Sequence, residues 1–136
     1  MKKKIYPKEI NYIKSNSFNF NIDINKEMLL NIKALKNCSS INLNSLKINE
    51  NELSFLNKNC FSSVESLYLS NTGIKSLNFL SFDSLSNLKN LDLSNNEIDD
   101  ISFLTENNVK CKHIIYFKLS NNKIRKGLEV LKTGIF

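Results

Sequence analysis

The sequence has few of the residues from which catalytic and metal sites are commonly built. Its 136 residues include one histidine, three cysteines, three glycines and no tryptophan. No paired acid or nucleophile accompanies His113, so we predict a solvated loop position for it and not a general base. Three glycines leave little room for a phosphate-binding loop, and neither G-x-x-x-x-G-K-[ST] nor G-x-G-x-x-G occurs. We expect a protein that is not an enzyme and has no cofactor or metal site.

Long apolar runs and paired cysteines are also absent. No stretch approaches the roughly 18 apolar residues that cross a bilayer, so we predict no membrane span. The basic start at Met1–Lys4 lacks the apolar core of a signal peptide. Cys38, Cys60 and Cys111 are odd in number and have no C-x-x-C spacing. We therefore expect small, buried, reduced thiols and a cytoplasmic location.

One apolar spacing recurs along the chain. Its clearest copy is L-x-x-L-x-L-x-x-N-x-I over residues 88–98, followed by the apolar Ile101, Phe103 and Leu104. Leu91 and Leu93 alternate about Asp92, which predicts a short strand with one buried face. The other copies, in the register that this spacing favours, are Leu43, Leu46, Ile48, Asn51, Leu53; Val64, Leu67, Leu69, Thr72, Ile74; and Ile114, Phe117, Leu119, Asn122, Ile124.

These copies predict one repeat domain over residues 18–136. Repeats open at residues 43, 64, 88 and 114, and an alternating apolar pattern beginning at Phe18 predicts a degenerate first repeat over 18–42. Residues 1–17 are polar and basic and are predicted to form a tail or loose cap. The last repeat is followed by no polar cap, which leaves edge-to-edge association or a truncated array as possibilities.

The pattern resembles the leucine-rich-repeat family, and its short mixed pitch is similar to that of phosphatase-regulatory and internalin-like repeats. The resemblance implies an α/β repeat solenoid with a curved parallel sheet of about five short strands on the concave face. Short turns or single-turn helices are expected on the convex face. The implied function is non-catalytic binding of a protein or peptide on the concave face. Three alternatives stay open: a structural segment of a longer surface or adhesion-type array, a fragment without a ligand, and an appendage to an enzyme.

The resemblance also assigns a structural role to the polar residue in each turn. In the family this asparagine is buried and hydrogen-bonds the backbone of its own and the neighbouring repeat. The corresponding ladder in this chain is predicted to be Asn51, Thr72, Asn96 and Asn122. Thr72 keeps a hydroxyl at a position where the other repeats have an amide.

Strand alternation predicts which side chains face outward on the concave surface. The predicted protein-binding residues are Lys47, Tyr68, Asn90, Asp92, Tyr116 and Lys118. Tyr68 and Tyr116 are the best anchors, because tyrosine offers a large contact area with a polar tip. The alternative interpretation is that all six occupy ordinary solvated strand positions. Five strands form a small face, which favours a weak or peptide-sized ligand.

Charge is segregated along the chain. Basic residues outnumber acidic residues by nine to three in 1–49 and by seven to one in 110–136, whereas acidic residues lead by nine to three in 50–109. Such segregation can steer a charged partner. Nucleic acid would require a continuous basic face with stacking aromatics, and the predicted concave face mixes charges. A protein or peptide partner is therefore preferred over nucleic acid.

Overall fold

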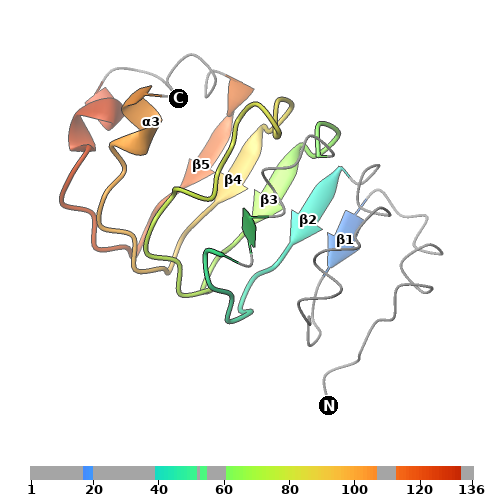
Figure 1. Cartoon of the computed structure of the whole chain (residues 1–136), viewed down its shortest axis with the longest axis horizontal. Coiled ribbons are helices and arrows are strands. Elements are labelled where there is room, and N and C mark those ends of the chain that lie inside the picture. Colours follow the sequence, from blue (N-terminus) through green and yellow to red (C-terminus); the bar gives the residue numbers. More distant parts are fainter. Residues whose placement is uncertain (1–16, 20–38, 52, 55–60, 107–112, 133–136) are drawn as a thin grey trace.

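The described part of the chain forms one parallel sheet of five short strands that follow each other in sequence order. The computed structural model describes residues 17–19, 39–51, 53–54, 61–106 and 113–132. The strands run side by side from one end of the molecule to the other (Figure 1). They are β1 (Ser17–Asn19), β2 (Ser40–Asn42), β3 (Ser66–Tyr68), β4 (Asn90–Asp92) and β5 (Tyr116–Lys118). Each repeat thus adds one strand beside its predecessor, and the predicted curved solenoid is confirmed.

The described parts of the return paths between strands contain little regular structure. Among the described residues, helical turns occur at α3 (Phe103–Glu106) and η4 (Leu128–Lys132), which lie apart from the sheet on the return side of the coil (Figure 1). Each of these two segments is short, four and five residues long. Gly127 allows the last two returns to approach closely, because a Cβ there would collide with the backbone of Ile101 and Ser102.

The core consists of apolar columns that run through successive repeats. Leu67 and Leu91 on the strands and Ile74 and Ile98 after the turns are fully buried. Strands stack about 4.7–4.9 Å apart, so each side chain packs against its counterparts above and below. Each buried side chain contributes roughly 1.5–3 kcal/mol to stability. In the last repeat, Phe117 and the other members of these columns are only partly buried.

The structure corrects the predicted register of the second strand. Ile41 pairs with Leu67, and the Leu43 amide donates to the Tyr68 carbonyl at 2.8 Å. The predicted opening of this repeat at Leu43 is therefore wrong by five residues. Leu46, which is buried, stands at the position that Thr72 occupies in the next repeat, whereas Asn51 is exposed. Asn51 is consequently not part of the ladder.

A column of left-handed residues marks the same position in four turns. Ser45, Asn71, Asn95 and Asn121 have φ between 56° and 62°. Asparagine adopts this conformation more readily than most residues that carry a Cβ, which accounts for three of the four. The column gives an independent register for the repeats, and this register agrees with the strand pairing.

The side-chain amides of the turn asparagines hydrogen-bond neighbouring repeats to each other. Asn96, which is buried, donates from Nδ2 to the carbonyls of Leu69 at 2.8 Å and Leu93 at 3.0 Å. Its Oδ1 accepts from the amides of Thr72 at 2.9 Å and Ile74 at 3.3 Å. Asn122 makes the same kind of contact one repeat later, donating to Leu93 and accepting from Ile98. One side chain thus satisfies backbone groups in two repeats at once.

Thr72 supports the ladder with its hydroxyl. Thr72 Oγ1 donates to the Leu69 carbonyl at 2.9 Å and lies 3.1 Å from Asn96 Oδ1. Threonine therefore completes its own turn but lacks an amide that would reach back to the preceding repeat.

Several sequence predictions lie outside the described residues. These are the tail before Ser17, most of the degenerate first repeat, and Cys38, Cys60 and Cys111. β1 begins one residue before the predicted start of that repeat, and its Phe18 pairs with Ile41.

We expect Asn96→Ala to lower the free energy of unfolding by about 3 kcal/mol, because it strands buried backbone groups in two repeats. Asn122→Ala should cost less, since Asn122 is only half-buried. Urea unfolding followed by circular dichroism measures both values. Asn78→Ala, at an exposed position, is the matched control. Equal stability of the Asn96→Ala and Asn78→Ala proteins would contradict the role of Asn96.

Ser45→Asn should stabilise the protein, because serine is the one member of the left-handed column that is not asparagine. The expected gain is about 0.5–1 kcal/mol, or roughly 2–5 °C in Tm. Lys47→Asn is the control, because Lys47 is exposed and has a negative φ. Thermal unfolding that shows the same change for both variants would argue against a backbone effect.

Candidate functional site

The concave face consists of three columns of outward-facing side chains. Strand pairing aligns Ser40, Ser66, Asn90 and Tyr116 in the first column and Asn42, Tyr68, Asp92 and Lys118 in the second. The third column follows the strands and contains Asn44, Ser70, Ser94 and Ser120. Most of these groups are hydroxyls and amides, so the face is polar apart from its two tyrosines.

The part of this face where aromatic and charged side chains meet lies on β4 and β5. Lys118 Nζ lies 5.3 Å from the centroid of the Tyr116 ring and 4.0 Å from Asp92 Oδ2. The Asp92 side chain is only 14% exposed, whereas Tyr116 is 52% exposed. An aromatic ring, a cation and a carboxylate thus meet within two adjacent strands.

Hydrogen bonds within and between the columns hold these polar side chains in place. Asp92 Oδ1 accepts from the Ser94 hydroxyl at 2.6 Å and the Ser94 amide at 3.0 Å. The Asn90 amide donates to the Ser66 hydroxyl at 2.9 Å. Asp92 is therefore oriented before any ligand arrives, which reduces the entropy lost on binding.

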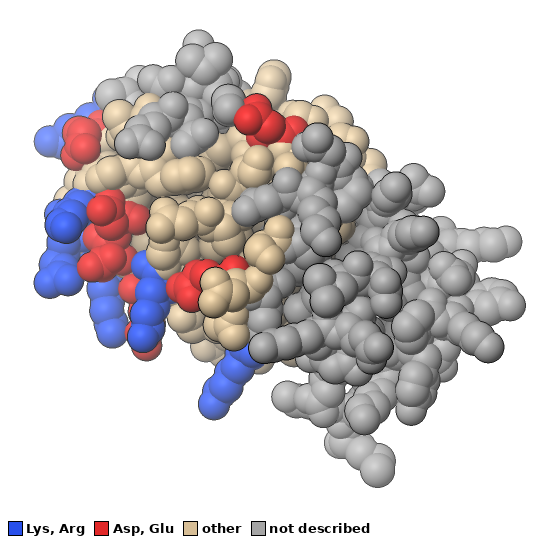
Figure 2. Space-filling model, viewed as in Figure 1, with Lys and Arg blue, Asp and Glu red and all other residues tan. Residues whose placement is uncertain are grey.

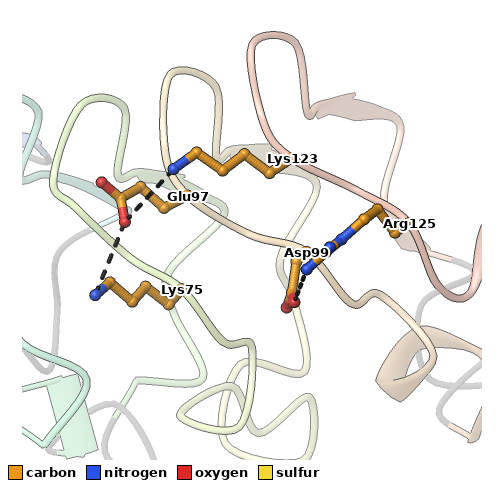
Figure 3. A pocket seen from close by; sticks show the side chains of 5 residues that line it. All are labelled: Lys75, Glu97, Asp99, Lys123 and Arg125. Atoms are coloured by element: carbon orange, nitrogen blue, oxygen red, sulfur yellow. Dashed lines mark hydrogen bonds and ion pairs between the residues drawn. The ribbon is translucent and has the colours of Figure 1, made fainter.

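A second group of polar side chains lies beside the sheet, just after the turns. We call it the charged flank; its members are Glu50, Lys75, Glu97, Asp99, Lys123 and Arg125. In Figure 3 the Glu97 side chain lies between two cations. Glu97 Oε2 is 3.8 Å from Lys75 Nζ and 4.0 Å from Lys123 Nζ. Beside them, Arg125 Nη2 is 3.2 Å from Asp99 Oδ2. Five of these side chains line an open pocket of about 390 Å³.

Carboxylates of the flank also accept backbone hydrogen bonds. Burial acts to raise the pKa of Glu50, but amide donors, above all that of Lys75 at 2.7 Å, together with the Lys75 charge hold it below its ordinary value. Next to the flank, the pKa of Asp100 is lowered by its hydrogen bonds with Ser102. Both carboxylates accept these hydrogen bonds most strongly when they are ionised.

The part of the chain that the structure describes offers no metal-binding cluster of three or more histidine, cysteine or acidic residues. In that same part, no helix has the length and apolar character needed to cross a membrane.

Comparison with known proteins identifies the repeat. Residues 62–106 match the family description "Leucine Rich repeats (2 copies)". This segment, which spans β3 and β4, consists of leucine-rich repeats. A comparison with curated protein sequences finds no match.

A solved leucine-rich-repeat structure has the same fold. The crystal structure of an internalin C2 from Listeria monocytogenes superposes with a TM-score of 0.63 at 21% sequence identity. The match covers 88% of this chain but 46% of the internalin chain, so this chain spans about half the length of that relative. The likeness concerns the fold of the repeats.

The leucine-rich-repeat sheet brings together five of the six predicted concave residues. Tyr68, Asn90, Asp92, Tyr116 and Lys118 all belong to its first two columns. Lys47 does not lie in these columns. Its predicted position on a strand depended on the register that is wrong by five residues. It lies after the turn, at the position that Gly73 and Glu97 occupy in the next two repeats.

Sequence reasoning missed the second strand's true contribution, which is Ser40, Asn42 and Asn44. A signal for it was present: Ile41-Asn42-Leu43-Asn44-Ser45 has the same alternation as Leu91-Asp92-Leu93-Ser94-Asn95. It also missed the charged flank, whose members come from four different repeats.

We expect the free energy of unfolding to fall as the pH drops below about 4.5, partly through Glu50. Its lowered pKa means that the unfolded chain binds the proton more readily, so the stability it contributes is present above the unfolded pKa and is lost on acidification. In Glu50→Gln this contribution should be missing at neutral pH, while the two proteins should converge at pH values where Glu50 is protonated. Urea unfolding across the pH range measures this. A constant difference between them at every pH would contradict it.

Proposed function

We propose that this protein is a non-catalytic binding module whose concave face contacts a protein or peptide. Leucine-rich-repeat domains generally mediate protein–protein interaction, which makes this the first expectation for the family. The cluster of Tyr116, Lys118 and Asp92 is the single observation that carries the proposal. It offers an aromatic contact, a cation and an oriented carboxylate on adjacent strands.

The chemistry of this cluster favours a partner with both apolar and polar groups. Tyr116 and the adjacent Ile115, which is 80% exposed, supply apolar area at the start of β5. Aromatic residues of this kind dominate binding energy when a partner desolvates them. Lys118 and Asp92 could then fix the orientation of the partner by charge pairing.

The size of the face favours a small ligand. Five strands about 4.8 Å apart span roughly 19 Å, whereas a standard interface buries about 800 Å² on each partner. An extended peptide lying across the strands would use Tyr68 and Tyr116 together, because these residues lie in neighbouring columns of the sheet.

A second function deserves a test because of the length comparison. The internalin chain is about twice the length of the part that matches here, so these repeats could serve as a segment of a longer array. In that case the open edge of the last repeat would associate with another element.

A cytosol-like compartment, which the cysteine pattern favours, remains part of the proposal.

The direct test is a quantitative pull-down of partners by the native protein and by Tyr68→Ala/Tyr116→Ala. We expect the double variant to bind a specific partner with at least about tenfold lower affinity, which is typical when hot-spot tyrosines are truncated. Leu128→Ala/Leu131→Ala is the matched control, because these residues are about as exposed as Tyr116 but lie in η4 on the return side. Retention of every specific partner at full affinity would show that the contact face is elsewhere.

A further inference from the structure

A hollow of about 600 Å³ lies between the turns of the β2 and β3 repeats. Its polar lining comes from Ser45, Lys47 and Asn49 of the first turn and from Asn71, Thr72 and Gly73 of the second. No acidic side chain is among the residues that line it. The hollow therefore has one cation and several uncharged polar groups.

Gly73 opens this hollow because it lacks a side chain where the neighbouring repeats have long ones. Strand pairing places Lys47, Gly73, Glu97 and Lys123 at the same position of successive repeats. A Cβ added to Gly73 would have no other atom within 4 Å. The position between Lys47 and Glu97 is thus open space that a ligand can enter.

The backbone explains why glycine occupies this position. Gly73 has a φ of 83°, and its amide donates to Asn96 Oδ1 at 3.0 Å, whereas the corresponding amide of Glu97 donates back to the preceding repeat. The Thr72 carbonyl accepts from the Ile48 amide at 3.4 Å, in place of the side-chain amide that threonine lacks. This orientation of the peptide group requires a positive φ, which glycine adopts without strain.

Lys47 differs from the cations of the charged flank in having no carboxylate beside it. Figure 2 shows blue and red groups interleaved at one end of the molecule, and Lys75, Lys123 and Arg125 each lie within 4.0 Å of a carboxylate oxygen. Among the described residues no such pair forms at Lys47, which is exposed. The charge of Lys47 is therefore available to a ligand.

The acids on either side of the hollow are engaged elsewhere. Glu50 Oε1 accepts from the Lys75 amide at 2.7 Å, and Glu97 Oε2 lies 3.8 Å from Lys75 Nζ. Both carboxylates are thus held by Lys75, whose side chain does not line the hollow. An anion that enters beside Lys47 meets no acidic group in the lining.

We infer that the hollow at Gly73 binds a carboxylate group through the Lys47 ammonium and the side-chain amide of Asn71. Asn71 Nδ2 has a hydrogen bond of 3.4 Å to the Ser45 hydroxyl and a second N–H to donate. Charge-assisted hydrogen bonds of this kind are stronger than those between neutral groups. The glycine lets the carboxylate approach the turn closely.

In the proposed complex the carboxylate belongs to an aspartate or glutamate side chain of the protein or peptide partner, and this assignment rests on the proposed function. The hollow adjoins the concave face, because Ser45 and Asn71 directly follow Asn44 and Ser70 of its third column. A partner that contacts Tyr68, on the same repeat as Gly73, thus passes beside the hollow. An acidic residue in the partner would then select for this end of the face by charge.

The probe is N-acetyl-glutamate N-methylamide, titrated into the full chain at low ionic strength and followed by proton–nitrogen correlation NMR. Its neutral counterpart is N-acetyl-glutamine N-methylamide. We expect saturable shifts of the Lys47 and Gly73 backbone amides with the glutamate probe, and at least about threefold weaker binding of the glutamine probe. The difference should shrink at high salt.

Two variants test the protein side. Lys47→Gln should remove the preference for the glutamate probe, whereas Lys75→Gln, which changes a flank cation outside the hollow, should keep it. Gly73→Asn should block both probes, because asparagine adopts a positive φ readily and its side chain would fill the open space. The spectra themselves report whether each variant is folded.

Tyr68→Ala/Tyr116→Ala separates this site from the proposed function, since it should bind the glutamate probe as the native chain does. If that variant also keeps every specific partner, the proposed function fails and the carboxylate site stands. If it loses a partner that Lys47→Gln binds at full affinity, the function stands and the assignment of a partner carboxylate to the hollow is wrong.

Three results would overturn the carboxylate site. They are equal affinity for the glutamate and glutamine probes, undiminished preference for glutamate in Lys47→Gln, and the absence of saturable shifts at Lys47 and Gly73. The first would mean that the hollow recognises an uncharged polar group.

Discussion

Backbone hydrogen bonding between successive repeats is the constraint on which the structure depends. A repeat this short buries too little to be stable alone, so it must satisfy its polar backbone through its neighbours. The strand amides do this along the sheet, and Asn96 does it in the turn, where its one amide group serves two repeats. Once that spacing is set, every side chain has a counterpart one repeat above and below.

The stacked arrangement turns one-dimensional patterns into surfaces. Residues that alternate on a strand form either the buried columns or the concave face, so Asp92, Lys118 and Tyr116 come together although they are far apart in sequence. Residues after the turn form the charged flank by the same rule. The acidic middle and the basic end of the chain, which are separate in sequence, there become interleaved and largely neutralise each other.

The register error in the second strand shows where sequence reasoning fails for this fold. Leu43, Leu46, Ile48, Asn51 and Leu53 match the repeat spacing letter by letter, and the true copy matches less well because Leu46 replaces asparagine. A spacing rule cannot distinguish two such frames. The hydrogen bond from the Leu43 amide to the Tyr68 carbonyl and the left-handed Ser45 can, because they require one frame in space. The corrected frame removes Lys47 from the concave face and Asn51 from the ladder.

The sequence by itself determined the repeat, the parallel sheet, the inward leucines and the outward residues of the strands β3 to β5. The repeat and its inward and outward faces follow from local periodicity, since alternation about Asp92 or Lys118 is a property of the strand alone. The parallel sheet is what the resemblance of these repeats to a known family implied. Only the tertiary structure decided the frame of β2, the pairing of Lys118 with Asp92 and Tyr116, and the ion pairs of the flank. Those depend on which residues become neighbours across repeats, and the chain specifies that through backbone pairing between strands and not through any single segment.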